Sequence, residues 1–270
     1  GGKIFYDSHE LATEQFSENA AWLRYTKPIV ETIESKYIKS ADVISTVSAS
    51  IGNHLEKKYQ LEKTPIILRN TPSYERTVSQ KSNKHVKLLY HGICMPGRGI
   101  ETAIETISLL PDRFNLTIRG PFQSPEYEES LRKLASKHDN ARITFAPALP
   151  VTQLVSSAAS FDIGLAIFPG RSLQKQYALP NKIFEYMMAG LALVVNNSQD
   201  LKKLVEETET GIVLANSTAE SLANSLNCLT AKMLEDFQNN SLAASEIYNF
   251  EKQSPPILEA YSNSMSSLGS

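Results

Sequence analysis

Nine short apolar runs, most of them separated by helical patterns, constrain the fold of this chain more than any other feature. Strands of this length that alternate with helices are typical of parallel βαβ units, whose strands are covered on both faces. The sequence therefore predicts an α/β fold. The runs lie at 3–6, 42–47, 65–68, 86–90, 115–118, 142–145, 162–167, 191–195 and 210–214.

The size of the chain favours two lobes over one. A chain of 270 residues with 41% hydrophobic content can bury one large core or two of ordinary size. The stretch from Asn70 to His85 is polar and has no hydrophobic pattern, as expected of a linker. We predict a first lobe over 1–72, a linker over 73–85, a second lobe over 86–248, and a C-terminal helix and tail over 249–270.

The first predicted lobe has too few strands to bury a full core. About three strands would leave one hydrophobic face of a parallel sheet uncovered. We expect an upstream segment or a partner chain to complete this lobe. The Gly1-Gly2 start is also compatible with two residues left by cloning.

Composition and charge exclude several classes of protein. The net charge is −2 and the basic residues are scattered, which argues against nucleic acid as a partner. The two cysteines match no metal-ligand spacing, and no signal peptide or membrane-spanning run appears, so we expect a cytoplasmic protein. Residues 21–40 are rich in aromatic and basic side chains, which suits peripheral contact with the inner face of a membrane. Glu31 and Glu34 interrupt that basic face and favour a solvated helix instead.

Residues 177–190 are the strongest candidate for a ligand-binding element. Pro180 suits the start of a short helix, Gly190 suits its end, and the following apolar run 191–195 suits a buried strand. A polar loop that leads into a helix ahead of a buried strand is where α/β proteins bind phosphate.

Three polar residues gather on one face of this predicted helix, namely Asn181, Lys182 and Glu185. The helix N-terminus and Lys182 would attract a diphosphate, and Glu185 could accept hydrogen bonds from sugar hydroxyls. This combination suits a nucleotide sugar. The alternative is a surface helix on which Lys182 and Glu185 pair with each other and bind nothing.

Two further turns are candidates for the same edge of the sheet. Gly92 follows the run 86–90, and Arg98 opens the next helix, so backbone N–H groups and a guanidinium can converge on phosphate oxygens. Arg119 ends the next strand, at the edge where open α/β sheets bind ligands. The alternatives are an ordinary βα turn for Gly92 and Arg98, and a solvated loop residue for Arg119.

The order of these elements resembles family 4 glycosyltransferases of the GT-B fold. The resemblance rests on Tyr-Asp-Ser-His-Glu after the first strand, Leu-Arg-Asn-Thr-Pro before the linker, the glycine-rich turn from His91 to Glu101, and Leu-Pro-Asn-Lys-Ile-Phe-Glu from Leu179. It covers nearly the whole chain. It implies two Rossmann-like lobes facing across a cleft, the N-terminal one incomplete, and transfer with retention of anomeric configuration. It also implies a nucleotide-diphosphate sugar as donor, with no obligatory metal or other cofactor.

The resemblance also implies roles for individual residues. Glu185 falls on the acidic position that binds the nucleotide ribose, and Arg98 matches the basic residue where the helix begins. Tyr177 stands where many relatives have a carboxylate for the donor sugar. A subset of relatives has Leu-Pro-Asn-Lys here, which implies that Asn181 and Lys182 take over polar contacts near the diphosphate.

His9 coincides with a family histidine that faces the donor sugar and the acceptor, which makes it the catalytic candidate; the alternative is a histidine that caps the next helix. The leading hypothesis is a retaining glycosyltransferase that moves a sugar to a glycan, a lipid-linked or a protein acceptor. A nucleotide-sugar 2-epimerase would need more acid–base carboxylates and histidines than the chain offers. The remaining alternative is a non-catalytic donor-binding or scaffold subunit of a two-part enzyme.

Overall fold

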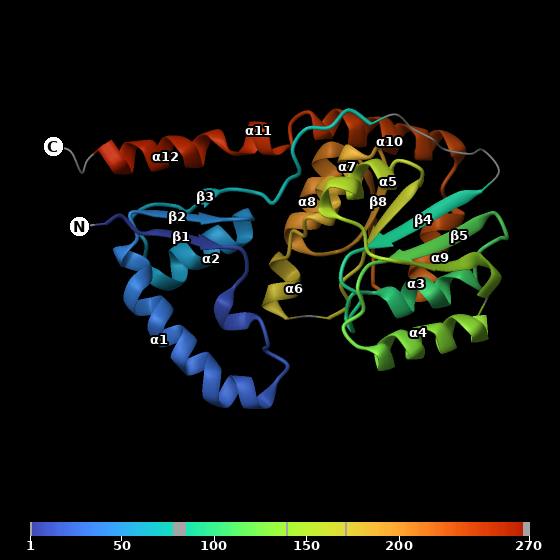
Figure 1. Ribbon diagram of the computed structural model, residues 1–270, viewed down its shortest axis with the longest axis horizontal. Helices are drawn as coiled ribbons and strands as arrows, with labels where there is room; N and C mark the ends of the chain where they lie inside the picture. The colour runs from blue at the N-terminus through green and yellow to red at the C-terminus, as the bar shows by residue number, and fades with distance from the viewer. Residues whose placement is uncertain (1, 78–84, 139, 171, 267–270) are drawn as a thin grey trace.

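Two α/β lobes lie side by side in the computed structural model, which describes residues 2–77, 85–138, 140–170 and 172–266 (Figure 1). The described residues form nine strands, and each overlaps one of the predicted apolar runs. The α/β prediction is therefore confirmed. Residues 78–84 of the predicted linker lie outside the described residues.

The first lobe contains a small parallel sheet in the order β1-β2-β3. Helices α1 and α2 cover one face, and α12 from the end of the chain lies against the other (Figure 1). Among the described residues β1 has no strand on its outer edge, so the expectation of about three strands is confirmed. The elements are β1 (Phe5–Ser8), β2 (Val43–Thr46), β3 (Ile66–Ile67), α1 (Lys27–Tyr37), α2 (Ala49–Tyr59) and α12 (Pro255–Ser266).

Short helical turns connect β1 to α1 and extend α1 at both ends. They are η1 (Ala12–Glu14), the π-helical turn η2 (Trp22–Thr26) and η3 (Ile38–Ser40). The core of the lobe forms where α2 and the loop after β1 meet, because Leu11, Ile51 and Leu55 are all buried there. The hydroxyl of Ser48 accepts a hydrogen bond from the backbone N–H of Ile51 and so caps the start of α2.

The second lobe contains a six-stranded parallel sheet in the order β6-β5-β4-β7-β8-β9. This is the strand order of a Rossmann fold, and the chain reverses direction across the sheet between β4 and β7. Ligands of such sheets bind in the crevice outside the carboxyl ends of the strands at that point. The strands are β4 (Val86–His91), β5 (Phe114–Arg119), β6 (Ile143–Ala146), β7 (Ile163–Ala166), β8 (Ala192–Asn196) and β9 (Gly211–Leu214).

Helices cover both faces of this sheet (Figure 1), and each face has its own buried hydrophobic cluster. The predicted helix end at Gly190 is confirmed, because Gly190 has the left-handed φ of 70° that follows many helix ends. On one face lie α3 (Ile100–Ile107), α4 (Pro125–His138) and α9 (Ala219–Asn227), and on the other lie α5 (Leu154–Ala158), α7 (Lys182–Met188), α8 (Gln199–Thr208) and α10 (Ala231–Ser245). Shorter turns are η4 (Asn140–Arg142) and η5 (Val151–Gln153).

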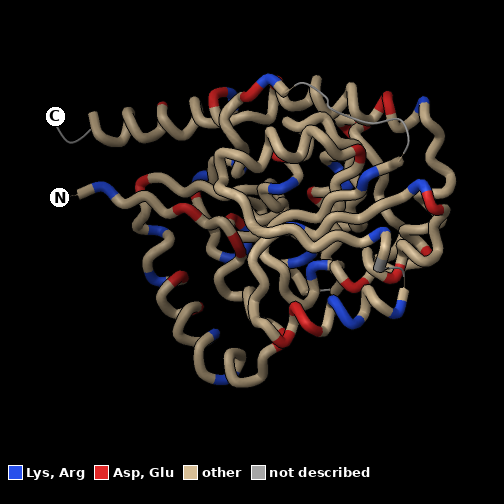
Figure 2. The backbone as a smooth tube through the Cα atoms, turned by 45° about the vertical axis from the view of Figure 1, so that its right-hand side comes forward, with Lys and Arg blue, Asp and Glu red and all other residues tan. Residues whose placement is uncertain are grey.

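Two segments join the lobes across the space between them. Helix α6 (Leu173–Tyr177) packs its two terminal residues against the core of the first lobe. The connection after β3 contacts α11 (Phe250–Gln253), where the backbone N–H of Phe250 donates to the carbonyl of Pro72 at 2.9 Å. These contacts fix how the two sheet edges face each other. Basic and acidic residues are interspersed over both lobes (Figure 2).

Candidate functional site

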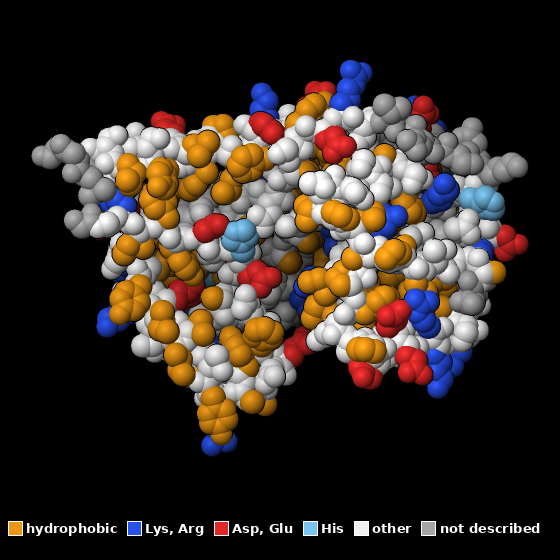
Figure 3. Space-filling model, in the orientation of Figure 1, with side chains coloured by type: hydrophobic (Ala, Val, Ile, Leu, Met, Phe, Trp, Pro, Cys, Tyr) orange, Lys and Arg blue, Asp and Glu red, His pale blue; other side chains and the backbone are white. Residues whose placement is uncertain are grey.

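A cleft of about 1130 Å³ lies between the two lobes. Its wall on the second lobe includes Arg98, which follows β4, and Phe168, which follows β7, so the cleft opens at the carboxyl ends of these central strands. Asn181 also lies on this wall. His9 and Asn70 line the opposite wall from the first lobe. The hollow between the lobes is visible in the space-filling view (Figure 3).

Lys182, the first residue of α7, is a buried cation beside this cleft. Only 9% of the residue is exposed, and its amine lies 3.9 Å from the centroid of the Tyr90 ring. Burial, reinforced by the nearby positive charge of Arg98, lowers the pKa of Lys182 from 10.5 to about 7. Lys182 forms no ion pair with any described residue and is buried, so the alternative of a surface helix on which it pairs with Glu185 is not what the structure shows.

Two cations share one aromatic ring at this point. The guanidinium carbon of Arg98 lies 5.5 Å from the centroid of Phe168, and the amine of Lys182 lies 5.8 Å from the same centroid. Like charges this close repel each other, and aromatic faces offset only part of that cost. An anion in the cleft would relieve the repulsion, and a phosphate group suits both an amine and a guanidinium.

Gly92 makes room for the amine of Lys182. It has a φ of +124°, and a Cβ at this position would lie 3.2 Å from the Nζ of Lys182. Gly99 has a similar constraint at the start of α3, because it has a φ of +72° and a Cβ there would lie 2.5 Å from the carbonyl oxygen of Ile167. Gly99 lets the turn after β4 approach the end of β7 closely, and Gly92 lets the side chain of Lys182 approach the same turn.

Glu185 lies one turn along α7 and contacts His91, the last residue of β4. Oε2 of Glu185 is 2.7 Å from Nε2 of His91. Burial lowers the pKa of His91 despite this carboxylate, so the imidazole is neutral near pH 7. Both ring nitrogens of His91 are buried without a hydrogen bond of good geometry. The Glu185 carboxylate, whose side chain is 15% exposed, therefore lies against His91 and retains acceptor capacity.

His9 is held by two residues of its own lobe, Asp7 at the end of β1 and Asn70 beyond β3. Its Nε2 lies 2.6 Å from Oδ2 of Asp7, and its Nδ1 lies 2.8 Å from the amide nitrogen of Asn70. Since an amide nitrogen can only donate, Nδ1 accepts from Asn70 and Nε2–H donates to Asp7. Asp7 is fixed in turn by the hydroxyl of Ser45 at 2.7 Å. His9 does not cap the following helical turn, whose N-cap is Leu11.

No metal site appears in the part of the chain that the structure describes, if three or more histidine, cysteine or acidic side chains are required. None of the described helices is both long and apolar enough to cross a bilayer.

Comparison with known proteins identifies the family. The profile described as Glycosyl transferases group 1 matches residues 85–232, which is more than half of the chain. The chain belongs to this family. The expectation of a glycosyltransferase is therefore confirmed. A separate comparison with curated protein sequences found no match.

Solved structures of other proteins have folds similar to that of this glycosyltransferase. WaaG, "a glycosyltransferase involved in lipopolysaccharide biosynthesis", has a TM-score of 0.71 and 16% identity, with 96% of this chain and 74% of that one covered. HepE of Anabaena in complex with UDP and glucose has a TM-score of 0.77 and 14% identity, with 96% and 71% covered. Sucrose-phosphate synthase of Thermosynechococcus elongatus has a TM-score of 0.79 and 14% identity, with 97% and 68% covered. The predicted GT-B arrangement is confirmed.

Arg119, which we expected at the ligand-binding edge of the sheet, contacts a neighbouring helix in this glycosyltransferase. Its guanidinium donates to the hydroxyl of Ser157 on α5 at 2.8 Å and lies over the ring of Phe161. Like Lys182 and Glu185, it is not among the residues that line the cleft, and burial lowers its pKa. The structure therefore brings Arg98, Asn181 and His9 to one cleft, with Lys182 beside them, and leaves Arg119 tied to a neighbouring helix.

Four residues of this site were not predicted from the sequence: Asp7, Asn70, His91 and Phe168. His91 and Phe168 lie at or just beyond the ends of the two central strands, a position that favours ligand sites and was the available signal. Asn70 had no such signal, because it lies 61 residues from His9 in the chain. Asp7 lies two residues before His9 near the end of β1, so its closeness in the sequence was the available signal.

Proposed function

We propose that this chain is a retaining glycosyltransferase that takes a sugar from a nucleotide-diphosphate donor. The observation that carries the proposal is the amine of Lys182, which is buried beside the cleft and forms no ion pair with a carboxylate of the described residues; the negative charge of Glu185 offsets only part of the cost of its burial. A buried cation without a counter-ion is costly, so it points to an anion that binds there. Arg98 on the cleft wall would supply the second positive charge.

The donor would lie across the end of the second sheet. Its diphosphate would contact Lys182, Arg98 and the backbone of the turn at Gly92, and its ribose hydroxyls would donate to Glu185. Asn181 on the cleft wall would contact the diphosphate or the sugar. Two cations would meet the charge of the diphosphate without a metal ion, and we propose that the reaction needs no metal or other cofactor.

The reaction would break the bond between the anomeric carbon and the diphosphate oxygen and form a bond from that carbon to the acceptor oxygen, and the acceptor hydroxyl would give its proton to the departing diphosphate. Negative charge then develops on the leaving diphosphate, and the cations of Lys182 and Arg98 stabilise it where water is partly excluded. His9 would contact the sugar or the attacking hydroxyl from the opposite lobe. Asp7 and Asn70 would hold its ring in one tautomer and one orientation. The acceptor would be a glycan, a lipid-linked or a protein hydroxyl bound on the first lobe.

Calorimetric titration tests the donor site. HepE binds UDP and UDP-glucose in its solved structures, so UDP is the first ligand to test, followed by GDP and ADP. Glu185→Ala should weaken nucleotide binding, whereas Glu206→Ala, which removes an exposed carboxylate from α8, should not. Failure of all three nucleotides at millimolar concentration, or equal affinity of both variants and the parent chain, would reject the proposal.

A donor-binding subunit without its own activity is the second candidate. The observation in its favour is the outer edge of β1, which has no strand partner among the described residues. A turnover assay with UDP-sugars separates the two candidates. A chain that binds UDP but transfers sugar only after a partner chain is added would be such a subunit.

A further inference from the structure

Helix α1 and the turn before it present a stripe of large apolar side chains to solvent. Tyr25, Ile29, Ile33 and Tyr37 are 64%, 59%, 55% and 55% exposed, respectively. They recur every four residues, so they lie on one side of the helical segment from Trp22 to Tyr37. Single exposed apolar residues are common, but a continuous row marks an interaction surface. We call these four residues the α1 stripe.

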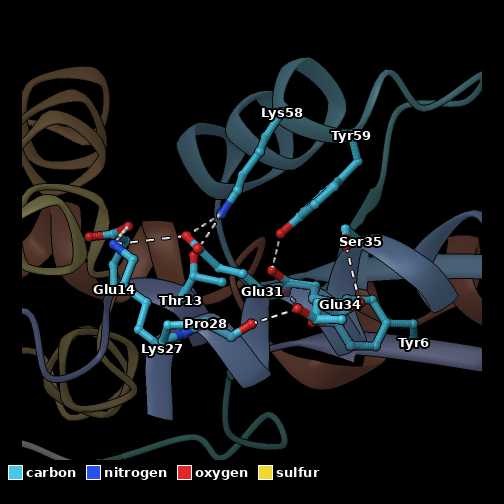
Figure 4. Close-up of polar contacts among 11 residues, drawn as sticks. Tyr6, Thr13, Glu14, Lys27, Pro28, Glu31, Glu34, Ser35, Lys58 and Tyr59 are labelled. Atoms are coloured by element: carbon cyan, nitrogen blue, oxygen red, sulfur yellow. Dashed lines mark hydrogen bonds and ion pairs between the residues drawn. The ribbon is translucent and has the colours of Figure 1, made fainter. Parts of the chain in front are cut away.

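The opposite side of the same segment faces the protein and carries Lys27, Glu31 and Glu34 beside the apolar Val30 and Ile38 (Figure 4). Glu34 is buried and accepts hydrogen bonds from the hydroxyls of Tyr6 at 2.6 Å and Tyr59 at 2.5 Å. Burial raises the pKa of both tyrosines, so both hydroxyls stay protonated and donate. A helix of a globular protein ordinarily buries its apolar side. Here the two hydrogen bonds of Glu34 hold that residue's side of the helix against the protein, so the α1 stripe faces solvent.

The two acidic groups of residues 21–40 contact the rest of the lobe on the inner side. Lys27 contacts Glu14 at 2.8 Å and Glu31 at 4.0 Å, and Lys58 of α2 contacts Glu31 at 3.7 Å (Figure 4). The two glutamates that interrupt the basic pattern of residues 21–40, Glu31 and Glu34, are thus bound to the rest of the lobe. The buried Glu34 does not oppose an anionic partner on the outer side, and the charge of Glu31, whose side chain is 42% exposed, is offset by Lys27 and Lys58.

The exposed charges beside the α1 stripe are positive. The guanidinium of Arg24 lies 5.4 Å from the ring centroid of Tyr25, and the amine of Lys36 lies 5.2 Å from that of Tyr37. Lys39 is exposed just beyond the end of α1. In Figure 3 apolar side chains gather over α1 at the lower left of the molecule, with basic side chains beside them.

We propose that the α1 stripe docks on an anionic membrane surface, with its apolar side chains in the interface and Arg24, Lys36 and Lys39 against lipid phosphates. Tyrosines suit this boundary because their rings are apolar and their hydroxyls remain hydrated. A second copy of the chain is a poorer partner, because two such surfaces face to face would bring their cations together. This inference is independent of the donor site proposed above.

Vesicle co-sedimentation of the full chain tests the proposal. The vesicles contain phosphatidylcholine alone or phosphatidylcholine with phosphatidylglycerol. The double variant I29S/I33S removes apolar area from exposed positions, and the matched control V151S/I247S does the same on the second lobe, where both residues are also exposed. A third variant, R24E/K36E, reverses two charges. Circular dichroism and thermal unfolding of each variant report whether its fold is retained.

The parent chain and V151S/I247S should bind the anionic vesicles with equal affinity, and added salt should weaken that binding. I29S/I33S should bind about tenfold more weakly or worse. The affinity of R24E/K36E for the anionic vesicles should fall roughly fivefold or more for each reversed charge. Equal binding to neutral and anionic vesicles, equal binding by I29S/I33S and the control, or no vesicle binding at all would overturn the proposal. A dimer in analytical ultracentrifugation that I29S/I33S abolishes, without vesicle binding, would assign the α1 stripe to self-association and overturn it too.

Discussion

Replacement of Lys182 by methionine should stabilise the free protein and abolish its affinity for nucleotide diphosphates. Methionine keeps much of the length of the buried side chain and fills irregular space well. It removes a charge that has no carboxylate partner among the described residues. An unpaired buried charge lowers the stability of a fold, and such charges persist at functional sites.

The size of the effect follows from the pKa of Lys182. The pKa falls from 10.5 to about 7, and each pKa unit is worth about 1.4 kcal/mol, so charging this amine in the folded protein costs about 5 kcal/mol at most. Local relaxation reduces the gain, and we expect Lys182→Met to raise the free energy of unfolding by about 2–4 kcal/mol at pH 6.

The gain in stability of Lys182→Met over the parent chain should decrease as the pH rises. Below pH 7 the lysine is charged in both the folded and the unfolded chain, and the full cost is present. Between about pH 7 and 10.5 the folded chain holds a neutral amine while the unfolded chain still binds a proton, so the cost declines as pH rises. The difference in stability between Lys182→Met and the parent chain should therefore be smaller at pH 9 than at pH 6.

Urea unfolding at pH 6 and pH 9, followed by circular dichroism, measures these differences, and titration with UDP measures the loss of affinity. Lys202→Met is the control, because Lys202 lies on the surface of α8, with 48% of its side chain exposed. Lys202→Met should change neither the free energy of unfolding nor the affinity for UDP appreciably. A Lys182→Met variant that is less stable than the parent chain at pH 6, or that binds UDP equally well, would refute the reasoning.

Three further outcomes are expected. The affinity for UDP should fall by up to about tenfold per pH unit above the Lys182 pKa of about 7, and a flat pH profile in calorimetry would contradict this. Arg98→Ala should cost about 1.5–3 kcal/mol of UDP binding and less of uridine binding, and equal losses for both ligands would place Arg98 away from the phosphates. His9→Ala should leave UDP affinity nearly intact but lower transfer by about 10²-fold, with a smaller loss of rate for Asp7→Asn; a loss of UDP affinity instead would remove His9 from catalysis.

The strands could be predicted because buried parallel strands are continuous apolar runs, and their flanking turns are marked by glycine and proline. The run 191–195 became β8, all of whose residues are buried, and Gly190 ended the preceding helix as predicted. The polar face of Asn181, Lys182 and Glu185 was also visible in the sequence, because it depends only on local helical spacing.

Partners far apart in the chain could not be predicted. Whether Lys182 has a counter-ion depends on how the ends of β4 and β7 meet, and Arg119 bonds to Ser157, which lies 38 residues away. The four-residue spacing of Tyr25, Ile29, Ile33 and Tyr37 would ordinarily place them against a core. They face solvent because Glu34 on the other side of the helix is held by two tyrosines from separate elements.

A crystal structure of the chain with UDP tests the central claim most directly, because it shows where the diphosphate binds. We expect diphosphate oxygens within about 3 Å of the Lys182 amine and the Arg98 guanidinium, with a ribose hydroxyl on Glu185. A nucleotide bound elsewhere, for example in the hollow of about 720 Å³ beside Lys3, Lys39 and α12, would contradict the account.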